Sequence, residues 1–200
     1  MNQKLDADFR ARCAAQAGKH YDMAEHLPVL SRYASACRDI VEFGVRTGNS
    51  TCALLHGLEQ AADPARLFSF DLEPADYAPP PLENTEWKFA QVDTAALATI
   101  PECDLLLVDT LHTAAQVTAE LRHAGRVRSW IFLHDTITWG SVGEQKEPGI
   151  TDAIYQFLAN EKGEWRVQAH WPQCHGLLCL ARVGRFHRAV HANPYLFPAA

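Results

Sequence analysis

The feature that most constrains the fold is a glycine-containing loop between an apolar run and a helix-like run. Residues 40–45 are mostly apolar and compatible with a β-strand, and Asn49 or Ser50 is the predicted N-cap of the following helix. Gly44 and Gly48 permit a sharp turn and a close approach of the backbone to a ligand. A strand, a glycine loop and a helix at the start of an α/β sheet form a site where nucleotide-like ligands bind.

The spacing of the two glycines separates this loop from other nucleotide-binding motifs. Glu42 stands two residues before Gly44, and Gly48 follows four residues after it, which gives the pattern E-x-G-x-x-x-G. This pattern is neither the G-x-G-x-x-G of dinucleotide-binding folds nor the G-x-x-x-x-G-K-[ST] of phosphate loops. The alternative interpretation is a structural turn from strand to helix with a surface acid.

Strand and helix patterns alternate along the rest of the chain. The further predicted strands are 65–71, 87–92, 103–109, 129–133, 165–171 and 177–183. The predicted helices, apart from the one after the glycine loop, are 5–17, 28–37, 94–99, 113–123 and 150–160. Five β/α repeats followed by an antiparallel pair predict an α/β fold, divided here into an N-terminal helical cap (1–37) and one larger domain (38–200).

Composition narrows the classes of protein that fit. With 200 residues, 48% of them hydrophobic and 21% charged, the chain can bury a sizeable core. The net charge of −6 argues against a broad nucleic-acid surface. No apolar stretch reaches the roughly 20 residues of a membrane span. Six cysteines without a C-x-x-C pair, and no signal-peptide pattern, predict reduced thiols in a cytoplasmic protein.

Acids stand at the ends of several predicted strands. In a parallel sheet these carboxyl ends face the ligand crevice. Asp71 ends the strand 65–71 and can accept hydrogen bonds from two ribose hydroxyls, with Glu73 as the second choice. Further along the chain, Asp109 and Asp135 end two successive strands, and each has a histidine nearby. We therefore expect a cluster of Asp and His side chains at one edge of the sheet.

The E-x-G-x-x-x-G loop resembles the first motif of class I S-adenosylmethionine-dependent methyltransferases. The resemblance implies a Rossmann-like, seven-stranded, mostly parallel sheet of order 3-2-1-4-5-7-6, with strand 7 antiparallel. It also implies S-adenosyl-L-methionine as the cofactor, with Glu42 near its amino group. Asp93 would accept the adenine amino hydrogen, or else cap the helix 94–99. The implied cofactor-binding residues are Glu42, Gly44, Val45, Arg46, Thr47, Gly48, Ser50, Asp71 and Asp93.

Two later stretches of the sequence indicate a narrower family than the glycine loop does. L-V-D-T-L-H-T at 107–113 and I-F-L-H-D-T at 131–136 look like the small-molecule O-methyltransferase group. This group includes the macrocin-type sugar methyltransferases and the proteins called cephalosporin hydroxylases. The resemblance, over roughly 38–183, implies methylation of a hydroxyl on a small molecule or sugar. From the net charge and the lack of a long apolar stretch we expect no nucleic-acid or membrane partner, and a homodimer is a candidate assembly.

Members of this group often use a divalent cation, with Mg²⁺ as the candidate ion. The resemblance assigns its ligands to Asp109, Asp135 and Thr136. Thr136 departs from the usual Asn or Asp, and Leu111 departs from the acid that some members carry there. Neighbouring strand ends lie about 5 Å apart, so two carboxylates there repel unless a cation or proton joins them. Mg²⁺ prefers such oxygen ligands.

The same resemblance supplies candidate catalytic residues. His112 lies three residues after Asp109, the offset at which catechol-type enzymes carry their general base, usually a Lys. A histidine can remove a proton near neutral pH. His134 is assigned to orient Asp135 or to line the pocket. The structural alternative for His112 is a residue at the start of a helix that hydrogen-bonds the loop.

Two other functions stay open at this point. One is a Rossmann-like cofactor-binding protein with different chemistry, such as a nicotinamide-dependent enzyme, against which the missing G-x-G-x-x-G counts. The other is a non-catalytic protein that kept the fold, which the missing third acidic ligand favours. The sequence does not reveal the methyl acceptor, because no recognisable motif marks the residues of the acceptor pocket.

Overall fold

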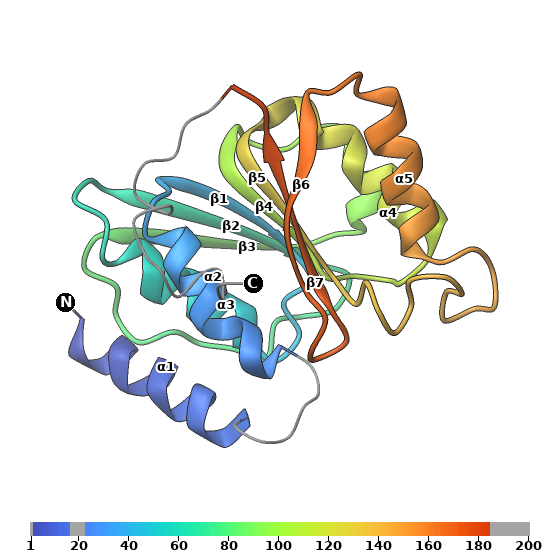
Figure 1. Cartoon of the computed structure of the whole chain (residues 1–200). Helices are drawn as coiled ribbons and strands as arrows, with labels where there is room; N and C mark the ends of the chain where they lie inside the picture. The colour runs from blue at the N-terminus through green and yellow to red at the C-terminus, as the bar shows by residue number, and fades with distance from the viewer. Residues whose placement is uncertain (1, 17–22, 185–200) are drawn as a thin grey trace, which may run out of the picture.

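One seven-stranded sheet organises the computed structural model, which describes residues 2–16 and 23–184. The strand order is β3-β2-β1-β4-β5-β7-β6 (Figure 1). β7 runs antiparallel to β5 and β6, and the other neighbouring strands are parallel. The strands are β1 (Asp39–Phe43), β2 (Ala65–Asp71), β3 (Thr85–Gln91), β4 (Cys103–Val108), β5 (Val127–His134), β6 (Trp165–Trp171) and β7 (Leu177–Arg182). The predicted order and the antiparallel strand 7 are confirmed.

Helices cover both faces of the sheet. They are α1 (Gln3–Gln16), α2 (Leu27–Ala34), α3 (Asn49–Leu58), α4 (Ala114–Leu121) and α5 (Ile150–Asn160), with 3-10 turns η1 (Ala24–His26), η2 (Thr94–Ala96) and η3 (Arg122–Arg126). The first three helices lie on one face, and α4 and α5 lie on the other (Figure 1). The predicted helix 94–99 is wrong beyond η2, because the backbone is already extended at Leu97. The predicted end of the first helix, at 17, lies outside the described residues.

β4 shows why the sheet is buried on both faces. Its side chains alternate, so Leu105 and Leu107 join the core beneath α2 and α3, while Leu106 and Val108 join the core beneath α4 and α5. All four side chains are at most 3% exposed. A continuous apolar run is the pattern expected for a parallel strand covered by helices on both sides. The carboxyl end of β4, where the site begins, is therefore held firmly.

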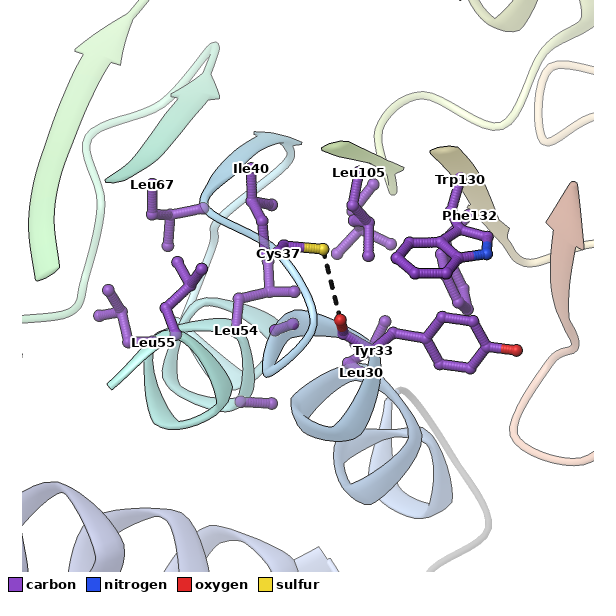
Figure 2. Close-up of a cluster of buried hydrophobic side chains, with 14 of the residues drawn as sticks. Leu30, Tyr33, Cys37, Ile40, Leu54, Leu55, Leu67, Leu105, Trp130 and Phe132 are labelled. Atoms are coloured by element: carbon purple, nitrogen blue, oxygen red, sulfur yellow. Dashed lines mark hydrogen bonds between the residues drawn. The ribbon is translucent and has the colours of Figure 1, made fainter. Parts of the chain in front are cut away.

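Helix α2 is part of the main core. The ring of Tyr33 lies edge-on to the rings of Trp130 and Phe132, with centroids 5.2 and 4.9 Å apart (Figure 2). Each such aromatic pair contributes about 0.5–1.5 kcal/mol beyond the burial of its area. The Tyr33 hydroxyl accepts a hydrogen bond from Gln168 at 3.0 Å, which satisfies its polar end. The division of the chain at residue 37 stays a prediction.

Two sequence predictions concern the environment of the chain. All six cysteines lie in the described part of the chain and are free there, as predicted for reduced thiols. Among the described residues, no helix has both the length and the apolar character needed to cross a bilayer.

Candidate active site

A cavity of about 470 Å³ lies where the carboxyl ends of the parallel strands meet. Most of the predicted site residues line it: Gly44, Val45, Arg46, Thr47, Ser50, Asp71, Asp93, Asp109, His112 and Asp135. The other four predicted residues, all in the described part of the chain, do not line it: Glu42, Gly48, His134 and Thr136. The sheet thus brings one loop and several strand-end acids to a single cavity, as parallel topology predicts.

The two glycines of the loop are required by the packing of the loop itself. Gly44 has φ +90, and a Cβ there would lie 1.8 Å from the backbone oxygen of Asp109. Asp109 also donates its backbone N–H to the oxygen of Phe43 at 2.9 Å, so the ends of β1 and β4 are in contact. Gly48 has φ +73, and a Cβ there would lie 2.3 Å from the ring of Tyr77. Any larger residue at either position is strained as well as crowded.

The N-cap of α3 is Gly48, so the predicted cap at Asn49 or Ser50 is wrong. The Asn49 side-chain oxygen accepts a hydrogen bond from Arg12 at 2.9 Å. The Ser50 hydroxyl donates to Glu42 at 2.7 Å. Because both side chains bond elsewhere, the first turn of α3 lies beside the cavity without a side-chain cap.

Glu42 lies beneath the glycine loop rather than in the cavity. It is 0% exposed, which makes the alternative of a surface acid wrong. Its carboxylate accepts hydrogen bonds from Ser50, Thr51 and Ser69 at 2.7, 2.9 and 2.6 Å. Burial raises the pKa of Glu42 to about 7, although the three hydroxyls oppose this rise. The residue ties β1 to β2 and to α3, and its predicted contact with the cofactor stays a prediction.

Asp71 shapes the loop from the neighbouring strand. One carboxylate oxygen accepts the backbone N–H groups of Val45 and Arg46 at 2.6 and 3.0 Å. The other accepts the N–H of Glu73 at 2.9 Å. Arg46 has φ 48, a conformation that non-glycine residues rarely adopt. A carboxylate has about four acceptor positions, so Asp71 retains one for a ligand in the cavity.

Asp93 performs the capping role that the sequence left open. Its side chain accepts the N–H of Ala95 at 2.9 Å and so caps η2. The same residue lines the cavity, so the contact with adenine stays a prediction.

A buried acid that the sequence analysis missed lies next to Asp93. Glu120 of α4 is 0% exposed and accepts hydrogen bonds from Thr94, Thr110 and Gln116 at 2.5, 2.8 and 2.9 Å. Those three residues line the cavity. An acid among the apolar positions of α4 was the only sequence signal. Glu120 fixes the wall of the cavity on this side.

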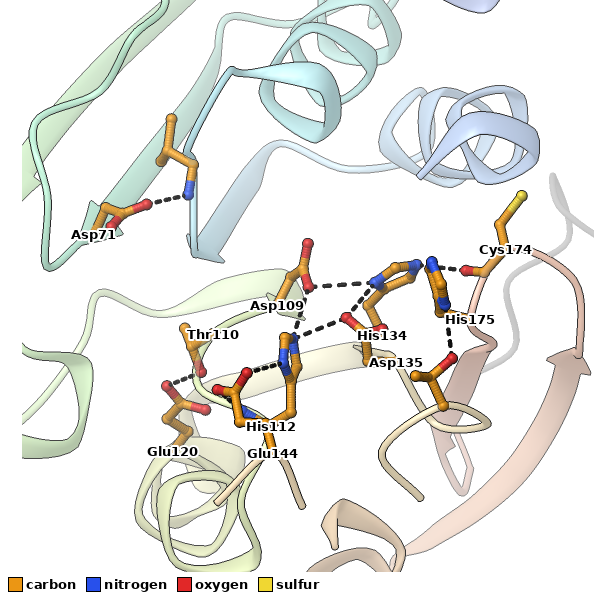
Figure 3. Close-up of polar contacts among 12 residues, drawn as sticks. Asp71, Asp109, Thr110, His112, Glu120, His134, Asp135, Glu144, Cys174 and His175 are labelled. Atoms are coloured by element: carbon orange, nitrogen blue, oxygen red, sulfur yellow. Dashed lines mark hydrogen bonds and ion pairs between the residues drawn. The ribbon is translucent and has the colours of Figure 1, made fainter. Parts of the chain in front are cut away.

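Asp109, His134 and Asp135 form a tight cluster at the ends of β4 and β5 (Figure 3). The His134 Nδ1 atom lies 3.0 Å from a carboxylate oxygen of Asp135 and 3.3 Å from one of Asp109. Its Nε2 atom lies 3.0 Å from the backbone oxygen of Cys174 in the connection between β6 and β7. Asp135 has φ 60, which turns the chain sharply at the end of β5. Such rare backbone conformations often occur at functional sites.

His112 approaches the cluster from the cavity. Its Nε2 atom lies 2.8 Å from an Asp135 carboxylate oxygen and 3.8 Å from one of Asp109. On its other side, Nδ1 lies 3.4 Å from Glu144, and its ring stacks on Trp139 with an interplanar angle of 6°. Glu144 comes from the loop between β5 and α5, and its contact with His112 had no sequence signal.

The charges in this cluster compensate one another. Burial lowers the pKa of both histidines, but the two carboxylates raise it more, to about 10 for His112 and for His134. Burial raises the pKa of Asp109 and Asp135, but the histidines lower it more, so both acids titrate below their usual range. At neutral pH two positive imidazolium groups thus face two carboxylates.

The cluster offers donor atoms that could hold a divalent cation, and two of them belong to the predicted ligands Asp109 and Asp135. Asp109, His134 and Asp135 each offer a ligand atom, and these atoms lie within 4.8 Å of one another. The Thr136 hydroxyl lies 3.0 Å from His170 Nε2, and its role as a ligand stays a prediction.

The sheet order and the glycine loop after β1 define the class I methyltransferase fold, and solved structures share it. The methyltransferase PaMTH1 of Podospora anserina, bound to SAH, has a TM-score of 0.57 and 16% identity, over 91% of this chain and 88% of its own. An O-methyltransferase of Bacillus cereus in complex with SAH has a TM-score of 0.56 and 14% identity, over 91% of each chain. The O-methyltransferase TomG of Streptomyces achromogenes, involved in tomaymycin synthesis and in complex with SAM, has a TM-score of 0.55 and 14% identity, over 92% of this chain and 91% of its own.

The family comparison agrees with the fold. Residues 41–136 match the family described as a methyltransferase domain. The matched segment begins in β1 and ends just after β5, so it contains the glycine loop and the Asp–His cluster. Residues 41–136 are therefore similar to a methyltransferase domain, and the predicted resemblance to class I methyltransferases is confirmed. A search of curated protein sequences finds no match.

Proposed function

We propose that this protein transfers a methyl group from S-adenosyl-L-methionine to a hydroxyl of a small molecule or sugar. The observation that carries the proposal is the shape of the cavity, which has the glycine loop on one side and the Asp–His cluster on the other. A cofactor along the loop would present its methyl group toward His112. The O-methyltransferase activity stated for the Bacillus cereus and Streptomyces structures supports the choice of a hydroxyl acceptor.

The cofactor half of the cavity has matching polar groups. Asp71 would accept the ribose hydroxyls while it holds the Val45 and Arg46 amides in place. Asp93 lies further along the cavity, where it would meet the adenine amino group. The uncapped first turn of α3 offers N–H groups, and the partial positive charge at a helix start attracts the cofactor carboxylate.

The acceptor half contains the proton-transfer groups. His112 would take the proton of the acceptor hydroxyl, with Asp135 holding its imidazole in place at 2.8 Å. The two carboxylates keep His112 protonated at neutral pH, since its pKa is about 10. His112 therefore becomes a base only when other positive charge compensates Asp109 and Asp135. A divalent cation held by these carboxylates would supply that charge and would lower the pKa of a coordinated hydroxyl.

The remaining parts of the proposal concern partners and location. A small-molecule or sugar acceptor would enter the cavity of about 470 Å³, which the glycine loop also lines. We further propose a cytoplasmic protein, as the free cysteines favour. A homodimer stays a prediction.

Two measurements test the proposed function. Calorimetric titration with S-adenosylhomocysteine should show binding, and the same titration with NAD should show none. Release of labelled methyl groups should then be measured with a panel of hydroxylated small molecules and sugars, with matched amines as the comparison. A protein that binds no S-adenosylhomocysteine would contradict the cofactor assignment. A protein that binds it but methylates only amines would contradict the hydroxyl acceptor.

A further inference from the structure

Helix α1 lies against α3 and reaches the glycine loop through one arginine (Figure 1). The guanidinium of Arg12 donates from a single nitrogen atom to the backbone oxygen of Thr47 at 3.0 Å and to the side-chain oxygen of Asn49 at 2.9 Å. Thr47 and Asn49 line the cavity, whereas none of the described residues of α1 does. The helix therefore supports the wall of the cavity from behind.

This contact belongs to a polar unit that joins α1 to the segment after β2. Asp8 lies one turn before Arg12 and accepts hydrogen bonds from Arg12 at 3.2 Å and from the Tyr77 hydroxyl at 3.1 Å. The guanidinium also lies 4.6 Å from the centre of the Tyr77 ring, a cation–π contact. The same ring occupies the space beside Gly48. Arg12 thus holds the loop directly and also contacts the side chain that packs against it.

Other contacts hold α1 only weakly. Among its described side chains, Leu5 is the one buried hydrophobic residue, and Phe9 stacks on His56 with ring centroids 4.0 Å apart. The rest of the helix has no continuous apolar stripe. An element with few buried apolar contacts opens locally more easily than the core does. The docking of α1 can therefore respond to what the cavity binds.

The position of Arg12 is unfavourable for α3 by itself. The start of a helix carries a partial positive charge, which an anion complements and a cation opposes. The first turn of α3 contains no acidic residue, and Arg12 places a positive charge against its first residue, Asn49. Asp8 compensates part of this charge. A local conflict of this kind is expected where function requires it, and here it favours a negative group at the start of α3.

The bond from Arg12 also occupies the Asn49 side chain. An asparagine at a helix start can accept hydrogen bonds from nearby backbone N–H groups and so satisfy them. Here the Asn49 oxygen accepts from Arg12, and the start of α3 has no side-chain cap. The free N–H groups of the first turn therefore stay available to a ligand in the cavity.

We propose that Arg12 is a positioning residue for the cofactor. It fixes the Thr47 peptide and the Asn49 side chain in the arrangement that leaves the start of α3 open to the cofactor carboxylate. Arg12 does not line the cavity, so it acts through these two residues. The inference rests on the proposed function and adds that cofactor binding and the docking of α1 are coupled, so that each stabilises the other.

The experiment is calorimetric titration with S-adenosylhomocysteine. Arg12→Met keeps the apolar stem of the side chain but removes its donors, and it should raise the dissociation constant about 5- to 150-fold, the usual range of such couplings. Arg12→Lys should recover part of the affinity, because both bonds come from one nitrogen atom that an ammonium group can replace. The matched control is Arg10→Met, which removes the equivalent pair with Asp6 on the same helix and should bind like the wild type.

A double variant distinguishes positioning from general support of the fold. If Arg12 acts through Asn49, the losses of affinity in Arg12→Met and Asn49→Ala should not multiply when the two changes are combined. Losses that multiply fully would show that Arg12 acts independently of Asn49 and would overturn the assigned role.

The wild-type protein supplies a measurement that needs no variant. Because coupling is reciprocal, saturating S-adenosylhomocysteine should slow amide hydrogen exchange in residues 3–16 at least about fivefold, although these residues do not line the cavity. Unchanged exchange in α1 overturns the inference. So does a dissociation constant for Arg12→Met equal to that of Arg10→Met.

The same titrations separate this inference from the proposed function. A wild-type protein that binds S-adenosylhomocysteine no more tightly than Arg12→Met does refutes the role of Arg12 and leaves the methyltransferase proposal standing. A wild-type protein that binds no S-adenosylhomocysteine contradicts the cofactor assignment, and the role of Arg12 with it.

Discussion

The carboxylate of Asp71 accepts the backbone N–H of Val45 at 2.6 Å, so the end of β2 holds the loop that follows β1. The same oxygen accepts the N–H of Arg46 at 3.0 Å, where the backbone has φ 48. One side chain thus both shapes the loop and lines the cavity beside it. The geometry of the loop and the recognition of a ligand are therefore coupled through Asp71.

Asp71→Ala should raise the dissociation constant of S-adenosylhomocysteine about 10- to 100-fold. A lost hydrogen bond to a charged acceptor costs roughly 1.5–3 kcal/mol, and the loop also loses its support. Titration calorimetry measures the change, with circular dichroism to verify folding. Asp76→Ala is the control, because it removes an exposed carboxylate whose backbone also contacts the loop. Equal affinities for wild type and Asp71→Ala would remove Asp71 from the binding site.

Gly44→Ala should destabilise the fold itself. The added Cβ would lie 1.8 Å from the Asp109 backbone oxygen, and the φ of +90 is unfavourable for alanine. We expect a loss of at least about 2 kcal/mol in the free energy of unfolding, measured with urea. Gly125→Ala is the matched control, because nothing lies within 4 Å of its added Cβ. If both variants unfold at the wild-type urea concentration, the close contact of β1 and β4 is wrong.

Glu42 should make stability depend on pH. Burial raises its pKa to about 7, whereas the value in the unfolded chain is near 4.5. Its protonated form therefore contributes stability that is complete below pH 4.5 and is lost as the pH rises through about 7. The whole change is on the order of 3 kcal/mol.

This dependence is tested by urea unfolding between pH 4.5 and 8. Glu42→Gln cannot ionise, so the part of the decrease that Glu42 contributes should be absent from the variant, whereas the decrease that His112 and His134 contribute above about pH 6.5 should remain. Glu86→Gln replaces an exposed glutamate on β3 and should retain the wild-type curve. Parallel curves for wild type and Glu42→Gln would show that Glu42 ionises in the folded protein as it does in the unfolded chain.

The sheet was predictable because its signals are local. β4 is a continuous apolar run whose alternate side chains fill both cores, and such a run predicts a central parallel strand. The acids at the strand ends followed from the same pattern, since parallel strands end at one edge. Asp71, Asp109 and Asp135 do line one cavity.

The details of the site depended on contacts between distant parts of the chain. Glu42 is buried because three hydroxyls, one of them on β2, surround it. Thr136 was expected at the cavity by its place after Asp135, but it does not line the cavity, and its hydroxyl lies 3.0 Å from His170 on β6. Glu144 reaches His112 from a loop 32 residues further along the chain. No local pattern encodes such contacts.

His112→Ala should lower kcat for methyl transfer by about 10²- to 10⁴-fold, the usual contribution of a positioned base. S-adenosylhomocysteine affinity should be unchanged, because His112 faces the acceptor side of the cavity. Glu144→Gln is the comparison: it keeps the size of the side chain 3.4 Å from His112 and should lower kcat by less than about tenfold.

The base works only when neutral, so activity should rise with pH through the pKa of His112. That pKa is about 10 while Asp109 and Asp135 are uncompensated, and added cation should move the rise toward neutral pH. A His112→Ala enzyme with wild-type kcat and the same pH profile would assign proton removal to another group and leave His112 as a structural residue of the loop.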